Sequence, residues 1–193
     1  MRRIGIFGGS FNPIHFGHIR LARYLLLQAG LDEVWFVVSP QNPMKQRGEM
    51  VDEDMRYEMV QIALNREQGL EASDVELQMP RPSYTWHTLQ KLKADFPDCE
   101  FTLIVGADNW ELFPKWYHAS DIISNYPIVV YPRSGSKFDT QNLPPNVRVV
   151  YTRRINISST QVRRRIREGH PINGLVPKEV AAYIARFGLY QEH

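Results

Sequence analysis

Short apolar runs alternate with amphipathic stretches along the chain. The runs at 4–7, 34–38, 101–105, 127–131 and 147–150 are apolar almost throughout, and this pattern predicts strands that are buried on both faces. In the stretches between and after these runs, apolar residues recur every three or four positions, as on one face of a helix. The helices predicted in this way are marked by Ile19 to Leu26, Met55 to Ala63, Leu89 with Leu92, 119–124, 159–168 and 177–186, and a further short strand is predicted at 75–77.

Polar residues and glycines mark where several of these helices begin and end. Ser83 or Thr85 is predicted to cap the helix that carries Leu89 and Leu92. Ser159 or Thr160 is predicted to cap the helix at 159–168. Gly188 is predicted to end the last helix, because glycine adopts the left-handed backbone conformation that often follows a helix.

Strands that alternate with helices in this way are typical of a parallel sheet covered by helices on both faces. The length of 193 residues favours one domain spanning residues 1–193. Ligands of such sheets bind beyond the carboxyl ends of the strands, where the turns at 8–18, 39–45 and 106–108 are predicted. The functional residues are therefore expected at these turns.

Composition and charge narrow the class of protein only slightly. Lys and Arg number 23 against 21 Asp and Glu, so the net charge of +2 gives no general reason to bind nucleic acid or an anionic membrane. Cys99 is the single cysteine, which excludes an internal disulfide and a cysteine-based metal cluster. No apolar run approaches the roughly 20 residues that cross a bilayer, and none precedes the first strand as a signal segment. We expect a cytoplasmic protein that binds neither membrane nor nucleic acid.

The eleven residues that follow the first strand carry the clearest chemical signal. Gly8 and Gly9 permit close approach of the backbone to a ligand, and Ser10 adds a hydroxyl. His15 and His18 are spaced i, i+3, so both can project from the first turn of the next helix, where backbone N–H groups also attract anions. A histidine pair could instead hold a metal or merely cap the helix, but no third metal ligand lies at a recognisable spacing. With the glycine turn before the histidines, a phosphate site is favoured.

A second candidate phosphate site lies near the far end of the chain, in Ile157-Ser158-Ser159-Thr160-Gln161-Val162-Arg163. The N–H groups at this predicted helix start, with the neighbouring hydroxyls and Arg163, could hold phosphates. Alternatively, the basic run 163–167 could form a nucleic-acid patch or a solvated face. For Arg164, Arg165 and Arg167 the solvated face is favoured.

Together the two segments resemble the nucleotidyltransferase superfamily, which includes the class I aminoacyl-tRNA synthetases. The glycine turn with His-Phe-Gly-His is similar to its H-x-G-H signature, whose histidines contact the ATP phosphates, and Ile-Ser-Ser-Thr-x-x-Arg is similar to the second phosphate motif of small adenylyltransferases. Gly17, between the histidines, is expected to leave room for the nucleotide. The resemblance implies that ATP is bound by Gly8, Gly9, Ser10, Phe11, His15, His18, Ile157, Ser158, Ser159, Thr160 and Arg163, with His15, His18 and Arg163 as the catalytic residues.

The middle of the chain looks like the nicotinate-mononucleotide adenylyltransferase family, and this resemblance spans essentially the whole sequence. It implies that Trp116 stacks on the pyridine ring, while Thr85 and the backbone around Tyr117 receive the nicotinate carboxylate. Gly106 is placed in the substrate site, with Asp108 near the nucleotide ribose. Taken alone, Trp116 would be read as a packing aromatic and Asp108 as a turn residue.

One loop departs from the family pattern. The family usually carries Pro-Pro-His-Lys after the second strand, whereas this chain has Asn42-Pro43-Met44-Lys45. Lys45 is retained and is expected to contact substrate phosphate, although the histidine is missing. How far the stretch 41–50 closes over a ligand is left open.

The resemblance implies an α/β, Rossmann-like doubly wound enzyme that transfers the adenylyl group of ATP to nicotinate mononucleotide. The products would be deamido-NAD and pyrophosphate, formed in NAD biosynthesis by direct in-line attack on the α-phosphate, with Mg²⁺ held mainly by the ATP phosphates and water and with no protein metal site. Three alternatives remain: a sister enzyme acting on nicotinamide mononucleotide or phosphopantetheine, a tRNA synthetase fragment, and a non-enzymatic nucleic-acid binder. The absence of a K-M-S-K-S-like segment argues against the synthetase fragment. The oligomeric state is left open, a homo-oligomer included.

Overall fold

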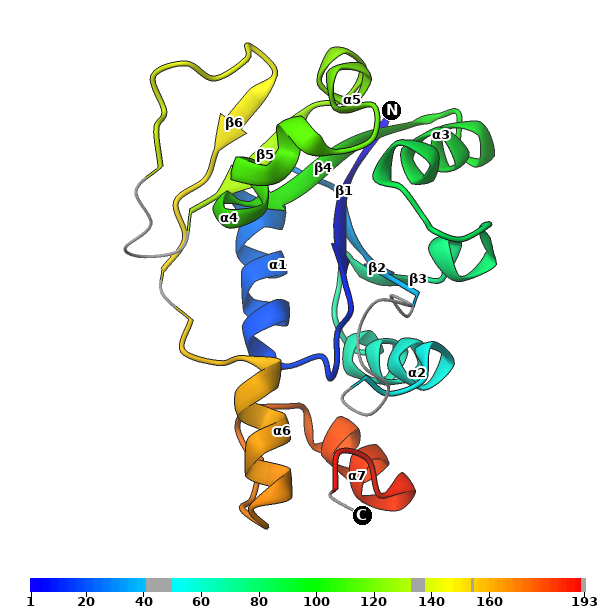
Figure 1. Ribbon diagram of the computed structural model, residues 1–193, viewed down its shortest axis with the longest axis vertical. Helices are drawn as coiled ribbons and strands as arrows, with labels where there is room; N and C mark the ends of the chain where they lie inside the picture. The colour runs from blue at the N-terminus through cyan, green and yellow to red at the C-terminus, as the bar shows by residue number, and fades with distance from the viewer. Residues whose placement is uncertain (41–49, 133–137, 154, 192–193) are drawn as a thin grey trace.

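The computed structural model describes residues 1–40, 50–132, 138–153 and 155–191. Strands and helices alternate as the hydrophobic pattern predicts (Figure 1). In chain order the elements are β1 (Arg2–Gly9), α1 (Phe16–Gln28), β2 (Glu33–Val38), α2 (Glu53–Leu64), β3 (Leu70–Ser73), the 3₁₀ helix η1 (Val75–Gln78), α3 (Thr85–Asp95), β4 (Cys99–Gly106), α4 (Ala107–Leu112), the 3₁₀ helix η2 (Phe113–Lys115), α5 (Ala119–Asn125), β5 (Ile128–Tyr131), β6 (Val147–Val149), α6 (Ser159–Arg167) and α7 (Lys178–Phe187).

The strands form one parallel sheet in the order β3-β2-β1-β4-β5-β6. The chain therefore builds outward from β1 to one edge, returns to the middle, and builds outward again from β4 to the other edge. This is a doubly wound topology, and its strand order reverses between β1 and β4, where α/β proteins commonly bind ligands. The predicted fold class is confirmed.

Two hydrophobic layers cover the two faces of the sheet. In β2, Val34, Phe36 and Val38 pack into the layer beneath α1, α2 and α7, while Trp35 and Val37 pack into the layer beneath α3 and α5. Successive side chains of a strand point to opposite faces, so a strand covered on both faces needs apolar residues at every position. This is why the central strands read as continuous apolar runs.

The strand predicted at 75–77 is wrong. These residues lie in η1, and the strand is β3, just before them, which pairs only with β2 at the edge of the sheet. Its residues Glu71 and Ser73 are polar, because an edge strand is partly open to solvent and needs no continuous apolar run. The backbone N–H of Leu77 donates to the carbonyl of Asp74, which closes the 3₁₀ turn instead.

The predicted end of the last helix is confirmed. Gly188 follows α7 with a φ of 59°, and its N–H donates back into the last turn. The helices within the described ranges are too short or too polar to span a bilayer. Helices α6 and α7 lie together at the lower end of Figure 1, where α6 begins beside the start of α1.

Candidate active site

A cavity of about 550 Å³ opens where β1 passes into α1. Its walls come from both predicted phosphate segments, from Asn109 in α4 and from Tyr131 at the end of β5, which lie far apart in the sequence. The described lining residues are Phe7, Gly8, Gly9, Ser10, Phe11, His15, Gly17, His18, Leu21, Asn109, Tyr131, Thr152, Arg153, Ile155, Ile157, Ser158 and Ser159. The structure therefore brings the glycine turn, both histidines and the first residues of the distal segment into one site.

The two histidines cap α1 reciprocally. The backbone N–H of His18 donates to Nδ1 of His15 at 3.3 Å, and the N–H of His15 donates to Nδ1 of His18 at 3.1 Å. Their rings stack with centroids 3.6 Å apart. Because each Nδ1 accepts a hydrogen bond, each imidazole is in the tautomer that carries its proton on Nε2. Capping and phosphate binding are thus compatible, since capping uses Nδ1 of each ring and the proton on Nε2 is of the kind that can be donated to a phosphate oxygen.

The backbone at the start of α1 differs from the expected cluster of phosphate-binding N–H groups. The N–H of Phe16 donates to the carbonyl of Leu175 at 2.9 Å, and that of His18 donates to His15. Two of the amides in the first turn are therefore engaged within the protein. The imidazoles, which line the cavity, are the better placed donors at this helix start.

The glycines of the first segment serve different purposes. A Cβ on Gly8 would meet no described atom within 4 Å, whereas a Cβ on Gly9 would lie 3.2 Å from the Phe11 ring. A Cβ on Gly17 would lie only 2.7 Å from Nδ1 of His15. Gly17 thus leaves room for the His15 imidazole. It also lines the cavity, and its expected role in leaving room for the nucleotide stays a prediction.

Phe11 packs against one of the two histidines. It is 2% exposed, and its ring meets the His18 ring edge-on, with centroids 5.0 Å apart. Contact with a packed aromatic limits rotation of the His18 side chain. Phe11 lines the cavity and packs against His18, while its predicted contact with ATP stays a prediction.

The cap of the distal helix differs from the prediction. The N-cap residue of α6 is Ser158, whose hydroxyl accepts from the N–H of Gln161 at 3.1 Å, rather than Ser159 or Thr160. The Ser159 hydroxyl instead donates to the carbonyl of Pro13 at 2.9 Å. This bond joins the two phosphate segments, which explains why they share one cavity.

Thr160 and Arg163 lie behind the glycine turn, outside the described lining of the cavity. The Arg163 guanidinium donates to the carbonyl of Asn12 at 2.9 Å and to the Thr160 hydroxyl at 3.4 Å. Its Nε is buried and has no hydrogen-bond partner among the described residues. A direct role of Arg163 on phosphate stays a prediction.

The predicted acceptor residues form a separate aromatic region. Thr85 is the first residue of α3, and the preceding Tyr84 contacts the ring of Tyr117, with centroids 4.7 Å apart. Trp116 is half-buried and packs against Phe113, with centroids 5.1 Å apart. The structure therefore brings Thr85 and the 116–117 segment close together, although neither lies in the described lining of the cavity.

The segment from Gly106 to Asn109 joins the two regions. Gly106 is buried at the end of β4, and a Cβ there would lie 2.7 Å from a carboxylate oxygen of Asp108. Asp108 is exposed in the first turn of α4, and the next residue, Asn109, lines the cavity. A ribose beside Asp108 would therefore stand between the cavity and the aromatic region.

Glu76 links residues at the start of α3 by hydrogen bonds to its side chain. Its carboxylate accepts from the Thr88 hydroxyl at 2.8 Å and from the Ser83 hydroxyl at 3.3 Å. Burial raises the pKa of the Glu76 carboxyl, although both hydrogen bonds act in the opposite direction. Ser83 is thus engaged with Glu76, and the N-cap of α3 is Tyr84, so the predicted caps Ser83 and Thr85 are wrong.

Lys45 lies outside the described residues, so its predicted contact is not placed. Sequence reasoning missed Asn109, Tyr131 and Thr152 as lining residues. The rule that ligands bind at the carboxyl ends of strands could have indicated Tyr131, which ends β5. Thr152 lies outside the strands, so this rule does not indicate it.

Comparison with known proteins gives a consistent result. The cytidylyltransferase-like family matches residues 6–165. A protein of Bacteroides fragilis named "probable nicotinate-nucleotide adenylyltransferase" is 46% identical over 170 residues, covering 88% of this chain and 85% of the relative. A protein of Bacteroides thetaiotaomicron with the same name is 42% identical over 185 residues, covering 96% and 92%. The fold is also similar to the solved nicotinic acid mononucleotide adenylyltransferase of Plasmodium falciparum complexed with NaAD, with a TM-score of 0.80 at 20% identity over 98% of each chain.

Proposed function

This chain belongs to the cytidylyltransferase-like family and, within it, to the nicotinate-nucleotide adenylyltransferases, and from that premise we propose how its residues carry out the reaction. The enzyme transfers the adenylyl group of ATP to nicotinate mononucleotide, which yields deamido-NAD and pyrophosphate in NAD biosynthesis. The observation that carries the assignment of roles is the pair of capped imidazoles facing a cavity shared with the distal segment.

His15 and His18 donate from Nε2–H to the α- and β-phosphates of ATP. A phosphate oxygen of nicotinate mononucleotide attacks the α-phosphorus in line, a new P–O bond forms, and the bond to the departing pyrophosphate breaks. Charge develops on the non-bridging oxygens and on pyrophosphate, and fixed donors stabilise it. No general base is needed, because the attacking phosphate oxygen is already ionised near neutral pH. The reciprocal caps support this role because they hold both rings in one orientation.

The remainder of the triphosphate lies against Ser10 and the Gly8–Gly9 backbone on one side and Ser158 and Ser159 on the other. The open space above Gly8 supports this placement, since a phosphate can approach the backbone there. Ile157, Thr160 and Arg163 complete the distal end. For Arg163 this contact would use guanidinium N–H groups other than the one that donates to Asn12, so that the bond to Asn12 is kept.

Nicotinate mononucleotide occupies the aromatic region. Trp116 stacks on the electron-poor pyridine ring, and the carboxylate takes donors from Thr85 and the backbone around Tyr117. Asp108 lies near the ribose, Gly106 lets the substrate approach β4, and Lys45 contacts phosphate. The contact between Tyr84 and Tyr117 supports this proposal, because it places the start of α3 beside the segment that carries Trp116.

ATP enters as its Mg²⁺ complex, and the cation supplies charge neutralisation on the phosphates when bound. The described residues that line the cavity carry no carboxylate. Within residues 1–40, 50–132, 138–153 and 155–191, no three His, Cys, Asp or Glu side chains gather closely enough to hold a metal ion. These residues fit a cation that keeps phosphate and water ligands, as Mg²⁺ commonly does.

The decisive experiment measures pyrophosphate release from MgATP with nicotinate mononucleotide, nicotinamide mononucleotide and phosphopantetheine as separate acceptors. We expect release with nicotinate mononucleotide to exceed that with the amide at least tenfold in kcat/KM, a difference of about 1.4 kcal/mol. A preference for the amide, or release with phosphopantetheine alone, would overturn the assigned acceptor. Binding of oligonucleotides without pyrophosphate release would instead support the non-enzymatic alternative.

A further inference from the structure

The turn that carries the site is held in an unfavourable backbone conformation. Phe11 has a φ of +47°, in the left-handed region that non-glycine residues rarely adopt. This conformation is unfavourable for a residue that carries a side chain, and it persists only where its surroundings hold it. The contacts around the turn Ser10–Pro13 therefore determine where the residues that follow, His15 included, are placed.

Two guanidiniums hold carbonyls of this turn. Arg56 of α2 is fully buried and donates from Nη1 to the carbonyls of Ser10 at 2.7 Å and Ser39 at 2.9 Å. From the other side, Arg163 of α6 donates to the carbonyl of Asn12. Because these carbonyls face the protein interior, the turn is anchored on the side away from the cavity.

The chain end supplies a contact to the Asn12 side chain. The hydroxyl of Tyr190 donates to Oδ1 of Asn12 at 2.8 Å, and the backbone N–H of Val51 donates to the same oxygen at 3.2 Å. Tyr190 itself has a φ of +64°. Burial raises the pKa of Tyr190, and the nearby Arg163 and Arg56 only partly oppose this. The hydroxyl therefore keeps its proton, and with it its donor role, across the working range of pH.

We propose that Tyr190 is a positioning residue for adenylyl transfer, acting through its hydrogen bond to Asn12 to hold the glycine turn and the histidines after it in register with the ATP phosphates. The proposal rests on the function proposed above. Tyr190 lies outside the described lining of the cavity, so its effect on phosphate must pass through the turn. Catalysis by fixed donors is sensitive to small displacements, and for this reason loss of the bond lowers kcat more than it weakens substrate binding.

The test compares two tyrosines near the end of the chain. Tyr190→Phe removes the hydroxyl and keeps the ring. Tyr183→Phe, in α7, is the matched control, because the Tyr183 hydroxyl donates to Glu58 on the surface, away from the turn. We expect Tyr190→Phe to lower kcat about tenfold with KM for ATP changed less than twofold, and Tyr183→Phe to leave both unchanged. Thermal unfolding of both variants identifies any general loss of folded protein.

Hydrogen exchange supplies a readout that does not depend on activity. The amides of residues 10–12, 14 and 15 should exchange faster in Tyr190→Phe than in wild type or Tyr183→Phe, since the turn opens locally more often. The kcat of the double variant Tyr190→Phe, Asn12→Ala should be no lower than that of Asn12→Ala alone, because both changes break the same contact. If the fold losses in kcat of the two single variants multiply in the double variant, Tyr190 acts through another contact.

An unchanged kcat together with unchanged exchange at 10–15 would overturn the proposal. A fall in kcat matched by an equal fall in folded protein would show a purely structural role and would also overturn it. Failure of the proposed function is a separate result, since wild-type protein would then release no pyrophosphate with nicotinate mononucleotide, while the exchange experiment would still report on the contact between Tyr190 and Asn12.

Discussion

The proposed nucleotide cavity and the proposed acceptor region are built in different ways. The cavity is formed around a turn whose carbonyls are tied by hydrogen bonds to α2 and α6, and its two histidines cap each other. In the acceptor region, by contrast, the rings of Tyr84 and Tyr117 contact one another at the surface, where they are 41% and 46% exposed.

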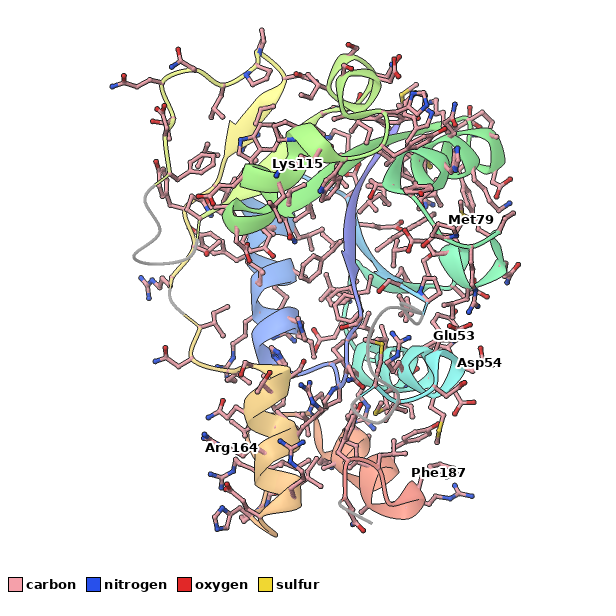
Figure 2. The ribbon with its side chains drawn as sticks, in the orientation of Figure 1. Glu53, Asp54, Met79, Lys115, Arg164 and Phe187 are labelled. Carbon is pink, nitrogen blue, oxygen red and sulfur yellow. The ribbon has the colours of Figure 1, made fainter. Side chains whose placement is uncertain are left out.

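The two regions lie in different parts of the molecule. Figure 2 shows Lys115, the residue before Trp116, in the upper part and Arg164 of α6 at the lower end.

This difference follows from what each region is proposed to recognise. Stabilising charge on a reacting phosphate needs donors that are already in place, because reorganisation during the reaction would raise the barrier. Recognition of a flat ring depends mainly on contact area, which exposed aromatic side chains can provide after small rotations. We therefore expect damage to the cavity to lower kcat, and damage to the acceptor region to raise KM for one substrate.

His18→Ala should have the largest effect. It removes one donor to the phosphates and one half of the reciprocal cap, so kcat should fall by roughly 10²–10³ while KM for nicotinate mononucleotide changes little. Steady-state pyrophosphate release measures both constants. Arg164→Ala serves as the control, because Arg164 is exposed on α6 (Figure 2). Turnover near wild type in His18→Ala would remove the proposed role of this histidine.

Trp116→Ala should have an intermediate effect and should separate the two regions. Loss of the stacking surface should raise KM for nicotinate mononucleotide about tenfold and leave KM for ATP unchanged, since stacking on one base or ring contributes about 1–3 kcal/mol. Trp110→Ala is the matched control, because Trp110 and Trp116 both contact the ring of Phe113. If both variants raise KM equally, Trp116 is a packing residue.

Glu76→Gln should have the smallest effect, on stability and its pH dependence. Because burial raises the pKa of this carboxyl in the folded protein, the folded state holds the proton more tightly than the unfolded state does. The unfolding free energy should therefore fall as pH rises from the ordinary carboxyl range through the raised pKa. The Gln variant lacks this fall, so its Tm relative to wild type should be higher near neutral pH than at acid pH.

Thermal unfolding between acid and neutral pH measures this difference. Glu71→Gln is the control, because Glu71 is an exposed carboxylate on the neighbouring strand β3. A variant whose Tm follows wild type at every pH would show that Glu76 does not resist ionisation in the folded protein.

Much of the fold could be predicted because its central strands are buried on both faces. The runs at 34–38 and 101–105 lie within β2 and β4, and the helix predicted from Ile19 to Leu26 lies within α1. The edge strand β3 was missed, because pairing with β2 on one side only places no apolar demand on every residue. Caps were missed for a related reason. Several hydroxyls stand near each helix start, and distant partners, Pro13 for Ser159 and Glu76 for Ser83, decide which of them caps.

The fold class could be predicted, and the two phosphate segments and the acceptor motif could be proposed, from residues close together in the chain, because their spacing defines local structure. Only contacts formed in the folded structure set which ring nitrogen of His15 and His18 carries the proton, give an imidazole its space at Gly17, and bring Arg163 and Tyr190 to Asn12. These last contacts join residues more than 100 positions apart. Their partners are set by how the sheet and helices pack, which the local sequence around each residue does not encode.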